Sequence, residues 1–257
     1  MNRVKLEAVS GQEEKQKKGF DIRKSKWGMG LIVSIPILLA ILKWDKSVGI
    51  PILAVFCFIG SWEIHKNIVP NIQTSRGWKR VIAITSITIL ILPMVWVWQV
   101  TENWNARFLL FVGFNNFITD TGAYAFGKAL SGRLTKLAPK ISPRKTWGGA
   151  LFGILSSIVF CYFVARPWLL NHEIIPFDNI TIITLIILGC IGNVLGDLGG
   201  SFFKRIADVK DSSQMLGEAQ GGIFDKLGGF AMCLYFYIAF FLFFKNILIP
   251  QDLMWPF

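Results

Sequence analysis

Seven long apolar segments constrain this chain more than any other feature of its sequence. Each reaches or approaches the roughly 20 residues that an α-helix needs to cross about 30 Å of hydrocarbon. The runs are continuous and lack the two-residue alternation of barrel strands, which excludes a closed β-barrel. We therefore predict an all-α, polytopic integral membrane protein with about seven transmembrane helices, at approximately residues 28–44, 48–64, 81–99, 107–127, 149–165, 180–197 and 229–249.

The first two apolar segments leave a second arrangement open. Both are short, and the second contains Glu63. A re-entrant or buried pair of helices is therefore an alternative to two crossings. An acid at membrane depth is costly unless it has a role. Glu63 is either a residue that supports a functional site or a buried structural acid, and we favour the structural role.

The distribution of basic residues predicts the orientation of the chain. Residues 1–26 contain eight Lys and Arg residues and no apolar core, which is typical of a cytoplasmic tail and not of a cleavable signal peptide. With the N-terminus in the cytoplasm, 22 of the 27 Lys and Arg residues lie on the cytoplasmic side, as the positive-inside rule requires, and the C-terminus lies outside. A single membrane domain, 27–257, then carries two cytoplasmic loops, 128–148 and 197–228.

The net charge of +11 does not require a nucleic-acid partner. Topology and contact with anionic lipid headgroups account for the excess of basic residues. The sequence has no basic stripe interleaved with aromatic residues of the kind that binds single strands. We therefore expect membrane lipids, and no nucleic acid, as partners of the basic surface.

The polar segment from Gly196 to Gly229 is the main candidate site, with five acidic and four basic residues between two apolar segments. Asp197 and Asp225 lie near its ends beside glycines, and carboxylate oxygens suit Mg²⁺, which usually binds through one or two carboxylates plus substrate phosphates. The neighbouring bases would complement a polyphosphate, although a merely solvated loop is the alternative. Those bases are Lys204, Arg205, Lys210 and Lys226.

Two further elements are expected on the same side of the membrane. Asp120 lies near the cytoplasmic end of its apolar segment, where it can meet Asp197 and Asp225 at one depth. The alternative for Asp120 is a helix-end acid with Thr119 and Thr121 as local partners. The loop 128–148 precedes another apolar segment, so backbone amides at that helix start could bind an anion, and Pro143 predicts a turn just before it. A basic topological anchor is the alternative for this loop.

These two polar blocks resemble the integral-membrane phosphatidate cytidylyltransferases, also called CDP-diacylglycerol synthases. The signature of that family runs approximately S-x-x-K-R-x4-K-D and then, after a short spacer, H-G-G-x-x-D-R-x-D. Upstream, the stretches DTGAY from Asp120 and SPRKTW from Ser142 look like the DTGAY and SPKKTWEG elements of the family. The resemblance covers roughly residues 115–235, and the matching signature positions are Asp197, Ser201, Lys204, Arg205, Lys210, Asp211, Gly221, Gly222 and Asp225.

The resemblance implies a reaction in which phosphatidate attacks the α-phosphorus of CTP and yields CDP-diacylglycerol and pyrophosphate. It implies a Mg²⁺ centre held by Asp197 and Asp225, leaves a second cation such as K⁺ and a homodimer open, and favours a bacterial inner membrane. Lys204, Arg205 and Lys210 would join the two aspartates as catalytic residues. The expected substrate-binding residues are Asp120, Ser142, Lys145, Ser201, Asp211, Gln220, Gly221, Gly222 and Lys226.

Several positions depart from the family pattern. Gln220 replaces the histidine of the signature, Gly148 replaces the glutamate of TWEG, and Lys226 and Gly228 alter the D-R-x-D element; the spacer is also one residue longer. Three functions therefore stay open. The chain is an active cytidylyltransferase, a CTP-dependent lipid kinase of the polyprenol type, or a catalytically impaired membrane protein that binds nucleotide or lipid.

Overall fold

The computed structural model describes residues 46–103, 107–130, 134–169, 178–213 and 222–248. The tail 1–26 and the first apolar segment, 28–44, lie outside the described residues. The main helices are α3 (Lys46–Glu63), α4 (Arg76–Asn103), α5 (Arg107–Ala129), α6 (Trp147–Phe160), α7 (Arg166–Leu169), α8 (Asn179–Ile206) and α9 (Phe224–Leu248). Short π-helical and 3-10 turns follow two of them, at Ile64–Ile68, Val69–Asn71 and Cys161–Ala165.

The described residues form a helical membrane protein, as the sequence predicted. The other six apolar segments coincide with α3, α4, α5, α6, α8 and α9. Three helical stretches are long and apolar enough to cross a membrane: Trp147–Ala165, Asn179–Ile206 and Phe224–Phe243. Aliphatic and aromatic side chains that remain exposed on these stretches, such as Leu155 and Phe243, suit a lipid environment.

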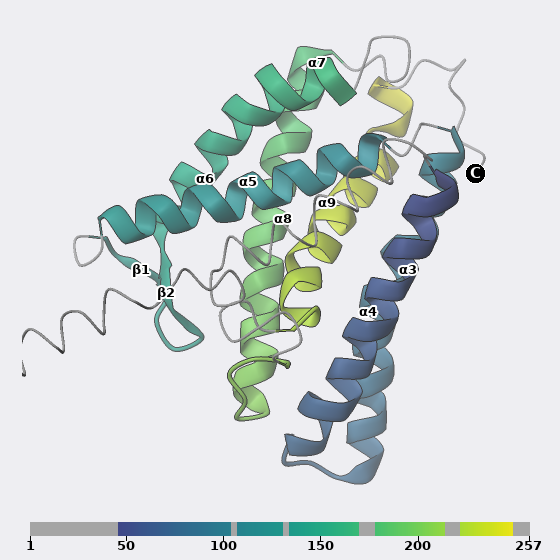
Figure 1. Cartoon of the computed structure of the whole chain (residues 1–257), viewed down its shortest axis with the longest axis vertical. Coiled ribbons are helices and arrows are strands. Elements are labelled where there is room, and N and C mark those ends of the chain that lie inside the picture. Colours follow the sequence, from purple (N-terminus) through teal and green to yellow (C-terminus); the bar gives the residue numbers. More distant parts are fainter. Residues whose placement is uncertain (1–45, 104–106, 131–133, 170–177, 214–221, 249–257) are drawn as a thin grey trace, which may run out of the picture.

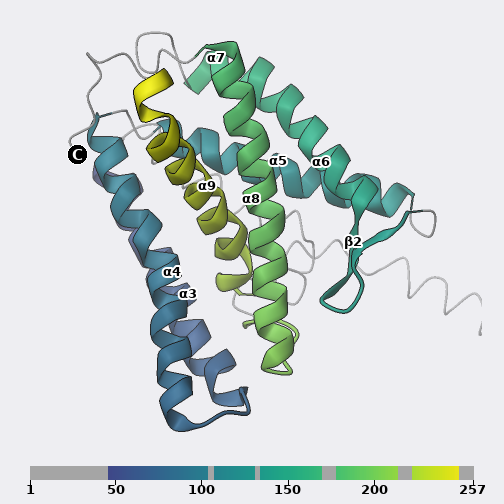
Figure 2. The same ribbon diagram turned by 180° about the vertical axis from the view of Figure 1, so that it is seen from behind.

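Helices α8 and α9 lie side by side at the centre of the molecule, with α3 and α4 on one side and α6 and α7 on the other (Figure 1). The view from behind shows α5 crossing the α8–α9 pair (Figure 2). The backbones of α8 and α9 approach closely at Gly196. A Cβ there would lie 2.8 Å from Met232 Cβ and closer still to the carbonyl oxygen of Gly228. Glycine therefore allows the contact that sets the spacing of the two helices beside Asp197.

A buried polar network fixes α5 against its neighbours. The Asn115 Nδ2 group donates to the Tyr237 hydroxyl at 2.8 Å and to the Ile186 carbonyl at 3.1 Å, and the Ser157 hydroxyl donates to Asn115 Oδ1. All three side chains of this network are fully buried. The network ties α5, the helix that also carries Asp120, to α6, α8 and α9.

Helix α8 continues well past the point where its apolar segment ends. The sequence predicted a loop over 197–228, but Asp197, Ser201, Lys204 and Arg205 lie on α8, which ends only at Ile206. Packing against α9 outweighs the low helix propensity of the glycines in this stretch. Asp208 adopts a left-handed conformation, with φ of 53°, just after the helix ends. Lys210 and Asp211 consequently lie beyond α8 and do not continue its helical spacing.

The loop 128–148 contains a small β-hairpin. Strands β1 (Lys136–Ala138) and β2 (Ser142–Thr146) pair antiparallel, with residues 139–141 as the turn. The turn predicted at Pro143 is therefore wrong. Pro143 lies within β2, where a two-stranded sheet leaves a free edge that tolerates a missing N–H donor. Helix α6 follows β2 directly, and Thr146 caps it by accepting a hydrogen bond from Gly149 N at 3.1 Å.

Candidate functional site

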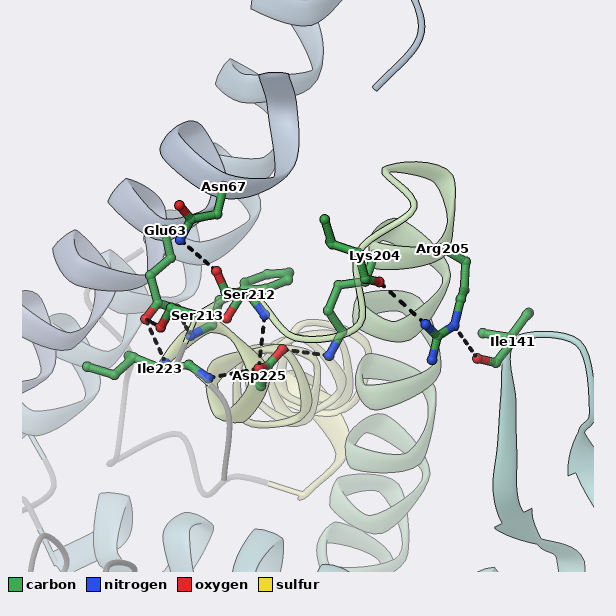
Figure 3. A network of polar contacts seen from close by, with 12 residues as sticks. Glu63, Asn67, Ile141, Lys204, Arg205, Ser212, Ser213, Ile223 and Asp225 are labelled. Atoms are coloured by element: carbon green, nitrogen blue, oxygen red, sulfur yellow. Dashed lines mark hydrogen bonds and ion pairs between the residues drawn. The ribbon is translucent and has the colours of Figure 1, made fainter. Parts of the chain in front are cut away.

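Asp225 lies in the first turn of α9 and accepts three hydrogen bonds (Figure 3). Lys204 Nζ on α8 is 2.6 Å from Asp225 Oδ1. The backbone N–H groups of Ser212 and Gly222 donate to Asp225 Oδ2 at 3.2 and 2.8 Å. The Lys204 and Asp225 side chains are only 12% and 10% exposed. Both oxygens of the Asp225 carboxylate therefore have hydrogen-bond donors, and the side chain is largely buried.

Asp197 pairs with a lysine from the hairpin. Lys145 Nζ in β2 is 2.8 Å from Asp197 Oδ2, and the two side chains are 27% and 24% exposed. The pair joins the end of the hairpin to α8. The structure thus brings together two residues that the sequence predicted on separate loops.

Asp120 joins the same region through Asn193. The Asn193 Nδ2 group donates to Asp120 Oδ1 at 2.9 Å and to the Asn116 carbonyl at 3.2 Å. Thr119 is not the local partner that the sequence suggested, because its hydroxyl donates to the Asn115 carbonyl inside the α5 helix.

The two site aspartates lie about one helical turn apart. A Cβ on Gly229 would lie 3.0 Å from Asp197 Oδ1, so Asp197 is level with Gly229 on α9. Asp225 precedes Gly229 by four residues, which is roughly 6 Å along a helix axis. Both aspartates therefore lie along the contact between α8 and α9.

The oxygen atoms around Asp197 fit a hard cation such as Mg²⁺. Asn193 Oδ1 is buried and has no hydrogen-bond partner among the described residues. It also lies against the position where a Gly229 Cβ would stand, next to Asp197 Oδ1. Among the described residues, no group of three or more His, Cys, Asp and Glu side chains is arranged so that it could hold a metal ion by itself. A cation held by the oxygen atoms of Asp197 and Asn193 would need further ligands, which phosphate oxygens and water could supply.

Arg205 holds the hairpin turn. Its Nε donates to the Ile141 carbonyl and its Nη1 to the Val209 carbonyl, both at 3.4 Å. Figure 3 shows the guanidinium reaching from α8 toward the hairpin, away from Asp225. Arg205 and Lys145 thus connect the hairpin to α8 at two points.

The remaining predicted site residues differ in how they are placed. Ser142 and Ser201 are half-buried, whereas Lys210, Asp211 and Lys226 are exposed. The N–H group of Gly222 donates to Asp225, so its role toward a phosphate stays a prediction. Gln220 and Gly221 lie outside the described residues.

Two residues of this region had no assigned role in the site from sequence. Asn193 precedes Asp197 by four residues, and Asn116 precedes Asp120 by the same interval, so each pair shares a helix face. That spacing could have found Asn193, because the predicted helix 180–197 already contains both Asn193 and Asp197. Glu63, which the sequence favoured as a structural acid, contacts the segment that positions Asp225.

Comparison with known proteins identifies the family of the chain. A model of the cytidylyltransferase family matches residues 15–244 of the 257. The chain belongs to the cytidylyltransferase family. Similar family members include proteins named phosphatidate cytidylyltransferase from Haemophilus influenzae (35% identical over 136 residues), Staphylococcus epidermidis (38% over 136) and Bacillus subtilis (41% over 126).

These cytidylyltransferases are longer than the present chain. The alignments cover 52%, 52% and 48% of this chain and 46%, 48% and 44% of the three relatives. The chain spans about half the length of the curated relatives it matches. The family model, in contrast, covers most of the chain.

Proposed function

We propose that this protein transfers a cytidylyl group from CTP to phosphatidate, giving CDP-diacylglycerol and pyrophosphate. In this reaction an oxygen of the lipid phosphate forms a bond to the α-phosphorus of CTP. The bond from that phosphorus to the oxygen bridging the α- and β-phosphates breaks, and pyrophosphate leaves with the electron pair. The names of the relatives support this choice of substrates.

One observation carries the proposal. Two aspartates lie about one turn apart where α8 meets α9, and each is within 2.8 Å of a lysine. Nucleotidyl transfer requires charge neutralisation and alignment of phosphates more than covalent catalysis. Paired carboxylates and lysines supply both requirements. Their position at the edge of apolar helices also suits a reaction between a soluble nucleotide and a membrane lipid.

Asp197 and Asp225 would hold Mg²⁺, with Asn193 Oδ1 as a further oxygen donor beside Asp197. When bound, Mg²⁺ neutralises phosphate charge and orients the triphosphate. A second cation such as K⁺ remains compatible with the oxygen-rich surroundings of Asp120 and Asn193. Lys145 and Lys204 would then exchange their carboxylate partners for phosphate oxygens as the substrate arrives.

The other basic residues would extend this phosphate site. Arg205 and Lys210 flank the end of α8 and would approach the leaving pyrophosphate. Lys226, which is exposed, would add positive charge to the same region. The remaining predicted residues would contact CTP or the lipid phosphate, namely Ser142, Ser201, Asp211, Gln220, Gly221 and Gly222.

The membrane arrangement is part of the proposal. We expect seven crossings, the tail 1–26 and the hairpin on the cytoplasmic side of a bacterial inner membrane, and the C-terminus on the other side. The excess of basic residues in the tail and polar loops supports this orientation. A reporter fused after Phe257 that is active only outside the cytoplasm would test it. If that reporter were inactive, and a reporter that works only in the cytoplasm were active at the same position, the orientation would be the opposite one.

An assay with radiolabelled CTP and phosphatidate in detergent micelles tests the reaction itself. We expect Mg²⁺-dependent formation of labelled CDP-diacylglycerol that disappears in Asp225→Ala. Release of CDP with phosphorylation of a lipid alcohol would identify a kinase instead. Retained CTP binding without turnover of any lipid phosphate would identify a binding protein.

A further inference from the structure

Glu63 lies at the end of α3, far in sequence from the candidate site, yet it contacts the segments that surround Asp225. Its side chain is fully buried. Each carboxylate oxygen accepts two hydrogen bonds. Oε1 accepts from the Ser213 hydroxyl at 2.6 Å and from Ile223 N at 3.1 Å. Oε2 accepts from the Ser212 hydroxyl and from Phe224 N, both at 2.9 Å.

The Glu63 and Asp225 carboxylates divide one set of donors between them. Ser212 gives its hydroxyl to Glu63 and its backbone N–H to Asp225. At the start of α9, Gly222 N donates to Asp225, whereas the next two N–H groups donate to Glu63. Figure 3 shows both carboxylates on opposite sides of these two short segments. Moving either segment away from Glu63 would move a hydrogen-bond donor of Asp225.

The surroundings of Glu63 leave little space for another arrangement. A Cβ on Gly222 would lie 2.8 Å from Glu63 Cδ and closer still to the Ser212 hydroxyl. Asn67, one turn after Glu63, donates to the Ser212 carbonyl at 2.7 Å. Residues from α3 and the following π-helical turn therefore hold Ser212 from two directions.

A purely structural acid at the start of α9 would need only the N–H groups of that helix. Glu63 also takes both serine hydroxyls of the 212–213 segment, which is not part of α9. It thereby sets the distance between the Ser212 and Gly222 N–H groups that converge on one oxygen of Asp225. By binding the 212–213 segment as well as α9, Glu63 affects the geometry of the site and not only the stability of the helix end.

We propose that Glu63 is a positioning residue that fixes the orientation of the Asp225 carboxylate for metal binding. The inference rests on the proposed metal role of Asp225. Glu63 touches neither substrate nor metal in this assignment; it acts through Ser212, Gly222 and the start of α9. Substitution of a residue that orients a metal ligand through hydrogen bonds typically lowers metal affinity by about 10- to 100-fold.

Glu63→Gln tests the proposal with the full chain in detergent. The substitution keeps the size of the side chain but places an amide NH₂ against two hydrogen-bond donors. We expect Mn²⁺ binding, followed by electron paramagnetic resonance without nucleotide or lipid, to weaken by about 10-fold. Hydrogen exchange at the Ser212 and Gly222 amides should accelerate in the same sample. Asn67→Ala, which frees the Ser212 carbonyl, should produce a smaller change in the same direction.

Ser157→Ala is the matched control. It removes a buried hydroxyl from the Asn115 network and should lower the unfolding temperature, but it should leave Mn²⁺ affinity and exchange at Ser212 and Gly222 unchanged. Unchanged exchange at these two amides in Glu63→Gln would overturn the inference. Equal Mn²⁺ affinity in Glu63→Gln and wild type, with weakened binding in Asp225→Asn, would also overturn it.

Failure of the proposed function would look different. In that case wild-type protein would bind Mn²⁺ and respond to Glu63→Gln but would not convert CTP and phosphatidate. The metal titration needs neither substrate, so the two results are independent.

Discussion

Asp225 and Asp197 each pair with a lysine, but their surroundings differ. Asp225 accepts two backbone N–H groups in addition to Lys204, and its side chain is 10% exposed. Asp197 pairs with Lys145 alone among its hydrogen bonds in the described chain and is 24% exposed. Its partner comes from a two-stranded hairpin. The Asp225 side is thus fixed by helix ends, whereas the Asp197 side depends on an element with a small contact area.

This difference suggests a division of labour. A rigid carboxylate can hold a cation in fixed geometry at low reorganisation cost. A lysine on a hairpin can change partners when a bulky triphosphate enters. The comparison predicts that changes on the Asp225 side affect structure and activity together, whereas changes on the Asp197 side affect activity with little structural cost.

Asp225→Asn and Asp197→Asn should give the largest effects. Each should lower the rate of CDP-diacylglycerol formation by about 10³-fold, because an amide replaces a charged metal ligand. Only Asp225→Asn should also accelerate hydrogen exchange at the Ser212 and Gly222 amides, since those groups donate to Asp225. Equal acceleration in both variants would show that the two sides form one unit.

Lys204→Met and Lys145→Met should differ in how much each lowers the free energy of unfolding. Removing Lys204 leaves a largely buried Asp225 charge without its cation and should lower the free energy of unfolding by about 3 kcal/mol. Removing Lys145 should cost about 1 kcal/mol or less, because its pair is partly exposed. Reversible unfolding in detergent at low and high salt measures both values. An equal decrease in the free energy of unfolding of the two variants would contradict the comparison.

The sequence predicted much of the helical framework because continuous apolar segments translate directly into helices. It also named Asp197, Asp225, Lys145 and Lys204, which the structure joins in two ion pairs, and their roles stay predictions. It differed from the structure where packing decides the fold: a loop was expected over 197–228, yet α8 packs against α9 and continues to Ile206. The Glu63 contacts join residues about 150 positions apart, as in the Ser212 bond. No local pattern encodes such a pairing, so only the fold reveals it.

Gly196→Ala and Gly199→Ala test whether helix spacing couples the two sides. An added methyl at Gly196 would meet the Gly228 backbone, so α8 and α9 must separate. We expect this separation to lower the free energy of unfolding by about 1–3 kcal/mol. Separation would shift Asp197 relative to Asp225 and lower activity. Nothing lies within 4 Å of a Cβ at Gly199, so Ala there should be neutral or stabilise the helix by up to about 1 kcal/mol. A harmful Gly199→Ala together with a neutral Gly196→Ala would contradict this packing.

Thr146→Ala should give the smallest effect and should stay on the Asp197 side. Thr146 ends β2 and caps α6 through Gly149 N, so loss of its hydroxyl should reduce stability by about 1 kcal/mol. Thr146→Ser keeps the capping oxygen and should retain most of that stability. If Ser were as destabilising as Ala, the buried methyl group, and not the cap, would be what Thr146 contributes. Exchange at the Ser212 and Gly222 amides should not respond to either variant, because the hairpin does not contribute a donor to Asp225.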